Sequence, residues 1–148
     1  MIHPAPTTPI APSLARGILF ELAGATGARG PHMVIEFPDS NYQLHLIPVG
    51  PISIASVGKR IVGTIRVTAR RVDVVDTGGK YVEPIYGRPR RVQGRVVSTD
   101  AKSNTVTVDA GVPIQLKLGD ARQTAGQFLV GELVSCDVMD GGTFEVAG

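Results

Sequence analysis

The sequence of 148 residues contains a single cysteine, Cys136, so no disulfide can form within the chain. Cys136 falls inside an expected strand, and no histidine lies near it in sequence to lower the pKa of its thiol. We therefore predict a buried structural thiol rather than a nucleophile. Nothing in the spacing of cysteine and histidine suggests zinc, and we expect neither a metal nor a cofactor.

Long apolar runs are also missing. No stretch reaches the length of a membrane span, and the first residues lack the charged start and apolar middle of a signal peptide. These absences predict a soluble, cytoplasmic protein with no membrane partner.

Residues that commonly carry catalysis are scarce. The three histidines are His3, His32 and His45, and the chain has neither a nucleophile elbow nor a phosphate-binding glycine loop. The glycine-rich loop over 24–30 lacks the lysine and the following helix that a phosphate cradle needs. We therefore expect a protein that is not an enzyme.

Glycine and proline, in contrast, are abundant. The chain holds 18 Gly and 11 Pro among 43% hydrophobic residues, which favours many short strands packed on a core over a few long helices. Apolar and polar residues alternate most clearly over 61–70, as a strand with one dry face and one wet face requires. Only 118–128 has the composition for a helical turn. The remaining expected strands cover 17–22, 32–37, 42–46, 93–97, 105–108, 113–118, 131–138 and 143–146.

An internal repeat organises these strands. Residues 42–46 match 114–118 at an offset of 72, and 32–37 match 105–110 at an offset of 73, as 57–61 match 130–134. A fourth match, between 78–82 and 141–145, has an offset of 63, so we expect a longer fourth strand or following loop in the first copy. We interpret the repeat as an internal duplication of one five-strand unit.

The expected strand order resembles the OB-fold, a small five-stranded β-barrel. It has five strands, a short non-strand segment after the third, and a Val-Gly-Glu/Lys sequence at the start of the fourth. The resemblance implies an all-β protein of two related OB-like barrels in tandem, while a tandem of SH3-like barrels is the alternative. The expected division is a flexible proline-rich arm (1–13), a first barrel (14–84), a joint (85–90) and a second barrel (91–148) whose five strands close on themselves.

Charge is distributed unevenly. Ten of the 15 basic residues lie between Lys59 and Arg95 with only three acids, so this segment carries +7 and the rest of the chain −5. Arginines that track phosphates, with aromatic rings on which bases stack, are typical of single-stranded nucleic-acid binding. The predicted polyanion-binding residues are Arg66, Arg70, Arg71, Arg88, Arg90 and Arg91, with Tyr81 and Tyr86 for stacking.

Two alternatives remain open beside this hypothesis. The basic stripe can pair with the acidic second half, where residues 96–148 carry three basic residues and seven acids, or with another copy of the chain. The protein is then a structural or scaffold module that forms a homo-oligomer or docks a protein partner. The second alternative is a barrel that binds a small ligand. The sequence thus predicts a binding protein and leaves its ligand open.

Overall fold

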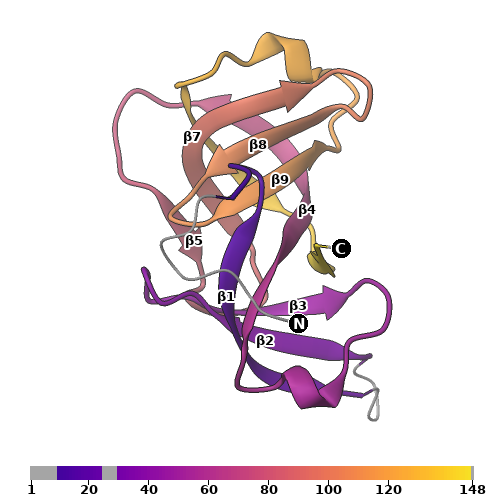
Figure 1. Cartoon of the computed structure of the whole chain (residues 1–148). Coiled ribbons are helices and arrows are strands. Elements are labelled where there is room, and N and C mark those ends of the chain that lie inside the picture. Colours follow the sequence, from indigo (N-terminus) through magenta and orange to yellow (C-terminus); the bar gives the residue numbers. More distant parts are fainter. Residues whose placement is uncertain (1–9, 25–29, 148) are drawn as a thin grey trace.

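The computed structural model describes residues 10–24 and 30–147 (Figure 1). Most of the predicted proline-rich arm (1–13) and most of the glycine-rich loop over 24–30 lie outside the described residues.

The all-β class predicted from the sequence is confirmed. The helical structure in the described ranges is limited to two 3-10 turns, η1 (Ile54–Ser56) and η2 (Ala125–Gln127), and no helix among them is long and apolar enough to cross a membrane. The strands are β1 (Ala15–Ala23), β2 (His32–Glu36), β3 (Gln43–Pro48), β4 (Arg60–Val74), β5 (Tyr81–Glu83), β6 (Tyr86–Gly87), β7 (Arg91–Asp100), β8 (Thr105–Asp109), β9 (Pro113–Leu118), β10 (Leu133–Val138) and β11 (Thr143–Val146).

All of these strands belong to one continuous mixed sheet rather than to two separate sheets. Strands β1, β2 and β3 form an antiparallel meander, and β4 returns to pair with β1. Strands β7, β8 and β9 form a second meander, and β10 returns to pair with β7. Each set of four strands is therefore a Greek key.

The strand that closes each Greek key comes from the other part of the chain. β11 lies between β3 and β4, parallel to β3 and antiparallel to β4, and so completes a closed circuit with β1, β2, β3 and β4. The second half of β4 lies between β9 and β10, parallel to β9 and antiparallel to β10, and completes a circuit with β7, β8, β9 and β10. The expectation that the strands of 91–146 close on themselves is wrong, because residues 143–146 pair with β3 and β4 instead.

The length of β4 explains this exchange. At about 3.3 Å per residue, its 15 residues extend about 50 Å, which is longer than one small barrel can use. In Figure 1, β4 runs from the lower part of the molecule to the upper part. Its predicted alternation is confirmed, with Ile61, Gly63, Ile65, Val67 and Ala69 buried on one face.

The two circuits share one hydrophobic core, which extends without a break from Leu19 and Phe144 to Leu116 and Val134. Phe144 of β11 is fully buried, and burying a side chain of this size contributes about 1.5–3 kcal/mol. Its ring packs against Gly63 of β4, where an added Cβ would collide with the phenyl ring and with the carbonyl oxygen of Glu145. Gly63 therefore gives β11 the room that it needs to lie against β4.

One short strand, β6, was not predicted, while β5 covers the segment that the repeat match of 78–82 with 141–145 assigned to the fifth strand of the first barrel. β5 pairs with β7, and β6, inside the expected joint, pairs in parallel with β3. The expected helical turn over 118–128 is limited to η2, while Gln123 in the preceding segment hydrogen-bonds to β4.

Candidate binding groove

A groove of about 770 Å³ lies where the two circuits meet. Strands β4, β7, β8, β9 and β11 and the turn before β11 contribute to its walls. Eight of its fifteen lining residues are serine or threonine. The lining consists of Ser13, Arg66, Val67, Thr68, Ser98, Thr99, Asp100, Ser103, Thr105, Thr107, Gln115, Lys117, Asp140, Gly141 and Thr143.

Strand register arranges the polar side chains of the groove in two rows that run across four strands. Partners in register lie side by side, about 4.8 Å apart, and point to the same side of a sheet. The first row is Arg66, Gln115, Thr107 and Ser98. The second row is Thr68, Lys117, Thr105 and Asp100.

Hydrogen bonds hold the first row at its β4 end. The Nε atom of Arg66 donates to Oε1 of Gln115 at 3.2 Å, and its Nη1 donates to Oε1 of Glu145 on β11 at 2.7 Å. The charge of Arg66 is therefore compensated within the chain, and its side chain connects β4, β9 and β11.

The second row ends in the turn between β7 and β8. Asp100 accepts hydrogen bonds from the backbone N–H of Lys102 at 3.0 Å and from the hydroxyl of Ser103 at 3.0 Å. The hydroxyls of Ser103 and Thr105 lie 2.9 Å apart. Asp100 thus shapes the rim of the groove, while the side chain of the exposed Lys117, between Thr68 and Thr105, makes no hydrogen bond or ion pair.

The predicted polyanion-binding residues do not gather at one place. Arg66 lies in the groove, Arg88 pairs with Asp140 at 2.6 Å, and Arg91 pairs with Asp137 at 2.7 Å. Arg71 pairs with Asp73 at 2.9 Å. Tyr86 is 62% exposed on β6, and Arg70 and Arg90 are exposed, with side chains that make no hydrogen bond or ion pair.

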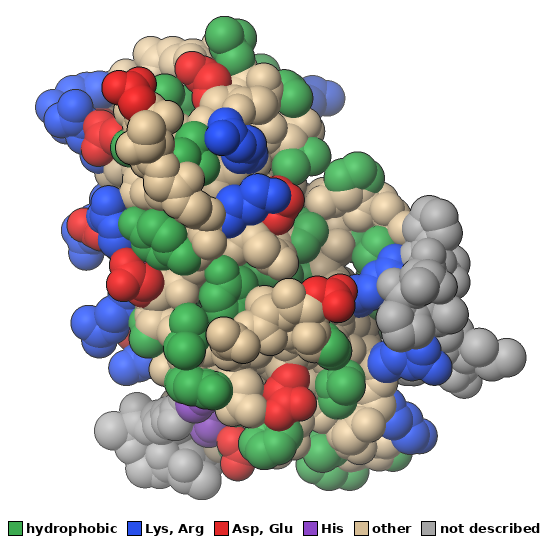
Figure 2. Space-filling view, turned by 90° about the vertical axis from the view of Figure 1, so that its left-hand side faces the viewer, with side chains coloured by type: hydrophobic (Ala, Val, Ile, Leu, Met, Phe, Trp, Pro, Cys, Tyr) green, Lys and Arg blue, Asp and Glu red, His purple; other side chains and the backbone are tan. Residues whose placement is uncertain are grey.

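Most of these ion pairs join the basic segment to the acidic second half, as one of the two alternatives expected. Figure 2 shows Lys and Arg side chains interspersed with Asp and Glu on one face of the molecule, not gathered into one basic area. Exposed pairs of this kind contribute about 0–1 kcal/mol each, but they reduce the positive field that a polyanion meets. The pairs between the segments are Arg66–Glu145, Lys80–Asp109, Arg88–Asp140 and Arg91–Asp137.

Arg91 and Tyr81 form a small cluster beside β7. Arg91 donates from Nε to the hydroxyl of Tyr81 at 3.3 Å and from Nη2 to the hydroxyl of Ser135 at 2.8 Å. The hydrogen bonds with Tyr81 and Asp137 raise the pKa of Arg91. Since Tyr81 also donates to Gln93 at 3.2 Å, its ring is held against the protein and is not a free stacking platform.

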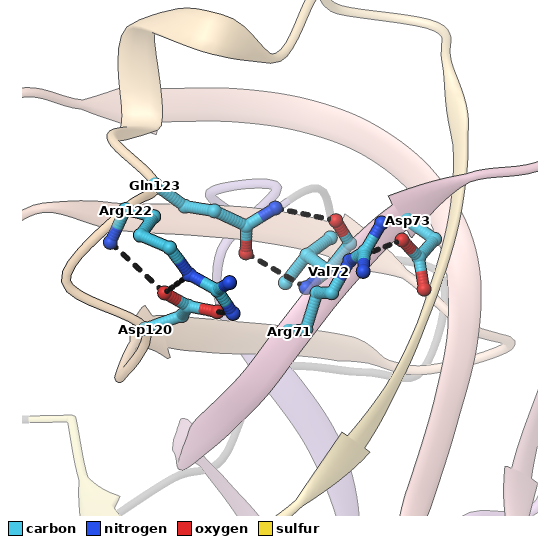
Figure 3. A network of polar contacts seen from close by, with 6 residues as sticks. All are labelled: Arg71, Val72, Asp73, Asp120, Arg122 and Gln123. Carbon is cyan, nitrogen blue, oxygen red and sulfur yellow. Dashed lines mark hydrogen bonds and ion pairs between the residues drawn. The ribbon is translucent and has the colours of Figure 1, made fainter.

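Arg71 lies beside a polar network that fastens the 119–124 segment to β4 (Figure 3). The side-chain amide of Gln123 accepts from the N–H of Val72 at 2.8 Å and donates to its C=O at 2.7 Å. The Gln123 side chain thus makes the two hydrogen bonds to Val72 that a neighbouring strand would otherwise make. Next to it, hydrogen bonds from Arg122 lower the pKa of Asp120 to about 2.

Catalytic and metal-binding features are weak in the described part of the chain. Burial raises the pKa of the Cys136 thiol to about 12. His32 and His45 stack with ring centroids 6.2 Å apart beside a small pocket of about 110 Å³. Within residues 10–24 and 30–147, no three histidine, cysteine or acidic side chains lie together as metal ligands would.

Apart from Arg66, the sequence analysis did not select the groove residues. A signal was present, because Thr105, Thr107, Gln115 and Lys117 alternate with buried apolar residues. That signal marks only an exposed sheet face, and the register that aligns four such faces is a tertiary property. No family model, curated protein or solved structure matches this chain.

Proposed function

We propose that this chain is a non-enzymatic binding protein whose ligand is an extended, hydroxylated chain, an oligosaccharide, held in the groove. The observation that carries the proposal is the double row of polar side chains across β4, β9, β8 and β7.

The fold supports this assignment if each circuit is an OB-like barrel. Each consists of a Greek key closed by a fifth strand parallel to its third. OB-folds bind oligonucleotides and oligosaccharides over their second and third strands and the loop between the first two. In the second circuit these are β8, β9 and the 101–104 turn, which line the groove.

The chemistry of the lining separates the two ligand classes. A serine or threonine hydroxyl both donates and accepts, as sugar hydroxyls do, whereas the oxygens of a phosphodiester only accept. Two basic residues, Arg66 and Lys117, face two acids, Asp100 and Asp140, so the formal charges of the lining cancel. Among the described lining residues none is aromatic, so bases would find no ring to stack on.

Binding of single-stranded nucleic acid to the basic stripe is the competing outcome. It is less favoured because four of the six selected arginines are ion-paired with acids of the same chain. If the protein is instead a scaffold module, it should form a homo-oligomer or a complex with a protein partner and bind no carbohydrate.

The test is binding to a panel of immobilised neutral and acidic oligosaccharides, with a labelled single-stranded oligonucleotide alongside at two salt concentrations. We expect saturable binding to one or more glycans and about a tenfold loss of affinity in Ser98→Ala/Thr105→Val, which removes two hydroxyls from the rows. Ser56→Ala/Thr77→Val is the matched control, since both residues lie outside the groove.

Retention of full affinity in Ser98→Ala/Thr105→Val, or the absence of binding to every glycan, would overturn the proposal. Oligonucleotide binding that weakens with salt and is lost in Arg88/Arg90/Arg91→Ala would favour the basic stripe instead.

A further inference from the structure

We infer that the ligand chain carries a singly charged anionic group, as an acidic sugar does, and that Lys117 binds it. This inference rests on the proposed function and specifies its ligand class.

The charges around the groove point to Lys117. Arg66 is neutralised by Glu145 at 2.7 Å, and Asp140 on the rim is neutralised by Arg88 at 2.6 Å. The carboxylate of Asp100 accepts hydrogen bonds from the N–H of Lys102 and the hydroxyl of Ser103 in its own turn. Among the charged lining residues that the structure describes, Lys117 is then the cation that lacks a partner.

The neighbours of Lys117 suit an anion. Register places Thr68 of β4 on one side and Thr105 of β8 on the other. The ammonium group and the hydroxyl of Thr68 offer several donors to a carboxylate or a sulfate ester, and hydrogen bonds to charged groups are the stronger ones.

The same balance excludes a densely charged polymer as the preferred ligand. One unpaired cation matches one charge, and a phosphate at every residue of a strand would bring further charges close to Asp100. The salt dependence of binding should therefore be shallow, as expected for the release of about one counterion.

The experiment compares three galactose tetrasaccharides: one that carries a single galacturonate residue, the methyl ester of that chain, and one that carries a single sulfate ester. The ester keeps the sugar and removes the charge, while the sulfated chain changes the kind of anion. The proteins are the wild type, Lys117→Gln and the control Lys102→Gln, which alters an exposed lysine in the turn beside the groove.

We expect the wild type to bind at least one acidic probe about tenfold more tightly than the ester, because a hydrogen bond to a charged group is worth about 1.5–3 kcal/mol. Lys117→Gln should lose this preference and keep the affinity for the ester, and Lys102→Gln should behave as the wild type. The galacturonate and sulfated arms then show which anion is recognised.

Equal affinity of the wild type for the ester and the acidic probes, or a preference that survives in Lys117→Gln, would overturn the inference and leave the proposed function intact. The absence of binding to all three probes and to the wider panel would overturn both.

Discussion

Gly63 is the residue on which the docking of β11 depends most directly. Gly63→Ala should lower the free energy of unfolding by about 1–3 kcal/mol, because the new methyl group collides with the Phe144 ring and the Glu145 carbonyl. Chemical denaturation measures the effect. Gly79→Ala is the matched control, since nothing lies within 4 Å of a Cβ there, and equal stability of the two variants would contradict the described packing.

Cys136 offers a second test at this scale. Cys136 is only 2% exposed, and burial raises the pKa of its thiol to about 12. The thiolate is therefore rare at pH 8. We expect no reaction with a thiol reagent in the native protein and one thiol per chain after denaturation. Fast labelling of the native protein at pH 8 would show that β10 does not lie between β4 and β7 as described.

Residue types predicted some of these roles and missed others. The burial of Cys136 could be predicted from its place in a strand. The close approach at Gly63 could not, because a strand pattern marks a glycine without showing which backbone lies against it.

At the scale of elements, the side chain of Gln123 and the backbone N–H of Gly119 fasten the 119–124 segment to β4. Gln123→Ala removes two hydrogen bonds to Val72 and should cost about 1–3 kcal/mol of unfolding free energy. Hydrogen exchange should show faster exchange of the Val72 amide. Gln127→Ala, which removes one exposed hydrogen bond to Thr124, is the control and should change stability less.

Most strands could be predicted because alternation and turn residues are local signals. The short strand β6 escaped prediction, and the repeat did not show that β5 pairs with β7, because both strands depend on their partners more than on any pattern of their own. Likewise, neither the composition of 61–70 nor the repeat indicates that β4 serves two circuits, since strand partners depend on tertiary contacts.

At the scale of the whole molecule, the exchange of β4 and β11 should make the two halves interdependent. A fragment of residues 91–148 lacks β4, so β9 and β10 would each have an unpaired edge and part of the core would be exposed. We expect this fragment to be unfolded or aggregated, with poorly dispersed amide resonances. A well-dispersed spectrum from 91–148 alone would show that the second half closes without β4.

The candidate site was predictable only in part. The basic segment is visible in the sequence, but its ion pairs with Asp109, Asp137, Asp140 and Glu145 depend on which strands meet. For the polar rows, the sequence shows the alternation of polar and apolar residues in each strand. The alignment of the four strands into rows appears only in the fold.

The most direct test of the proposed site is a titration of ¹⁵N-labelled protein with the tetrasaccharide that carries one galacturonate residue, followed by amide chemical shifts. The account predicts progressive shifts over 66–68, 98–107 and 115–117, which line the groove, and little change at the 88–91 arginines. Shifts concentrated at 88–91 with an unchanged groove would contradict it, and so would a spectrum that does not respond at all.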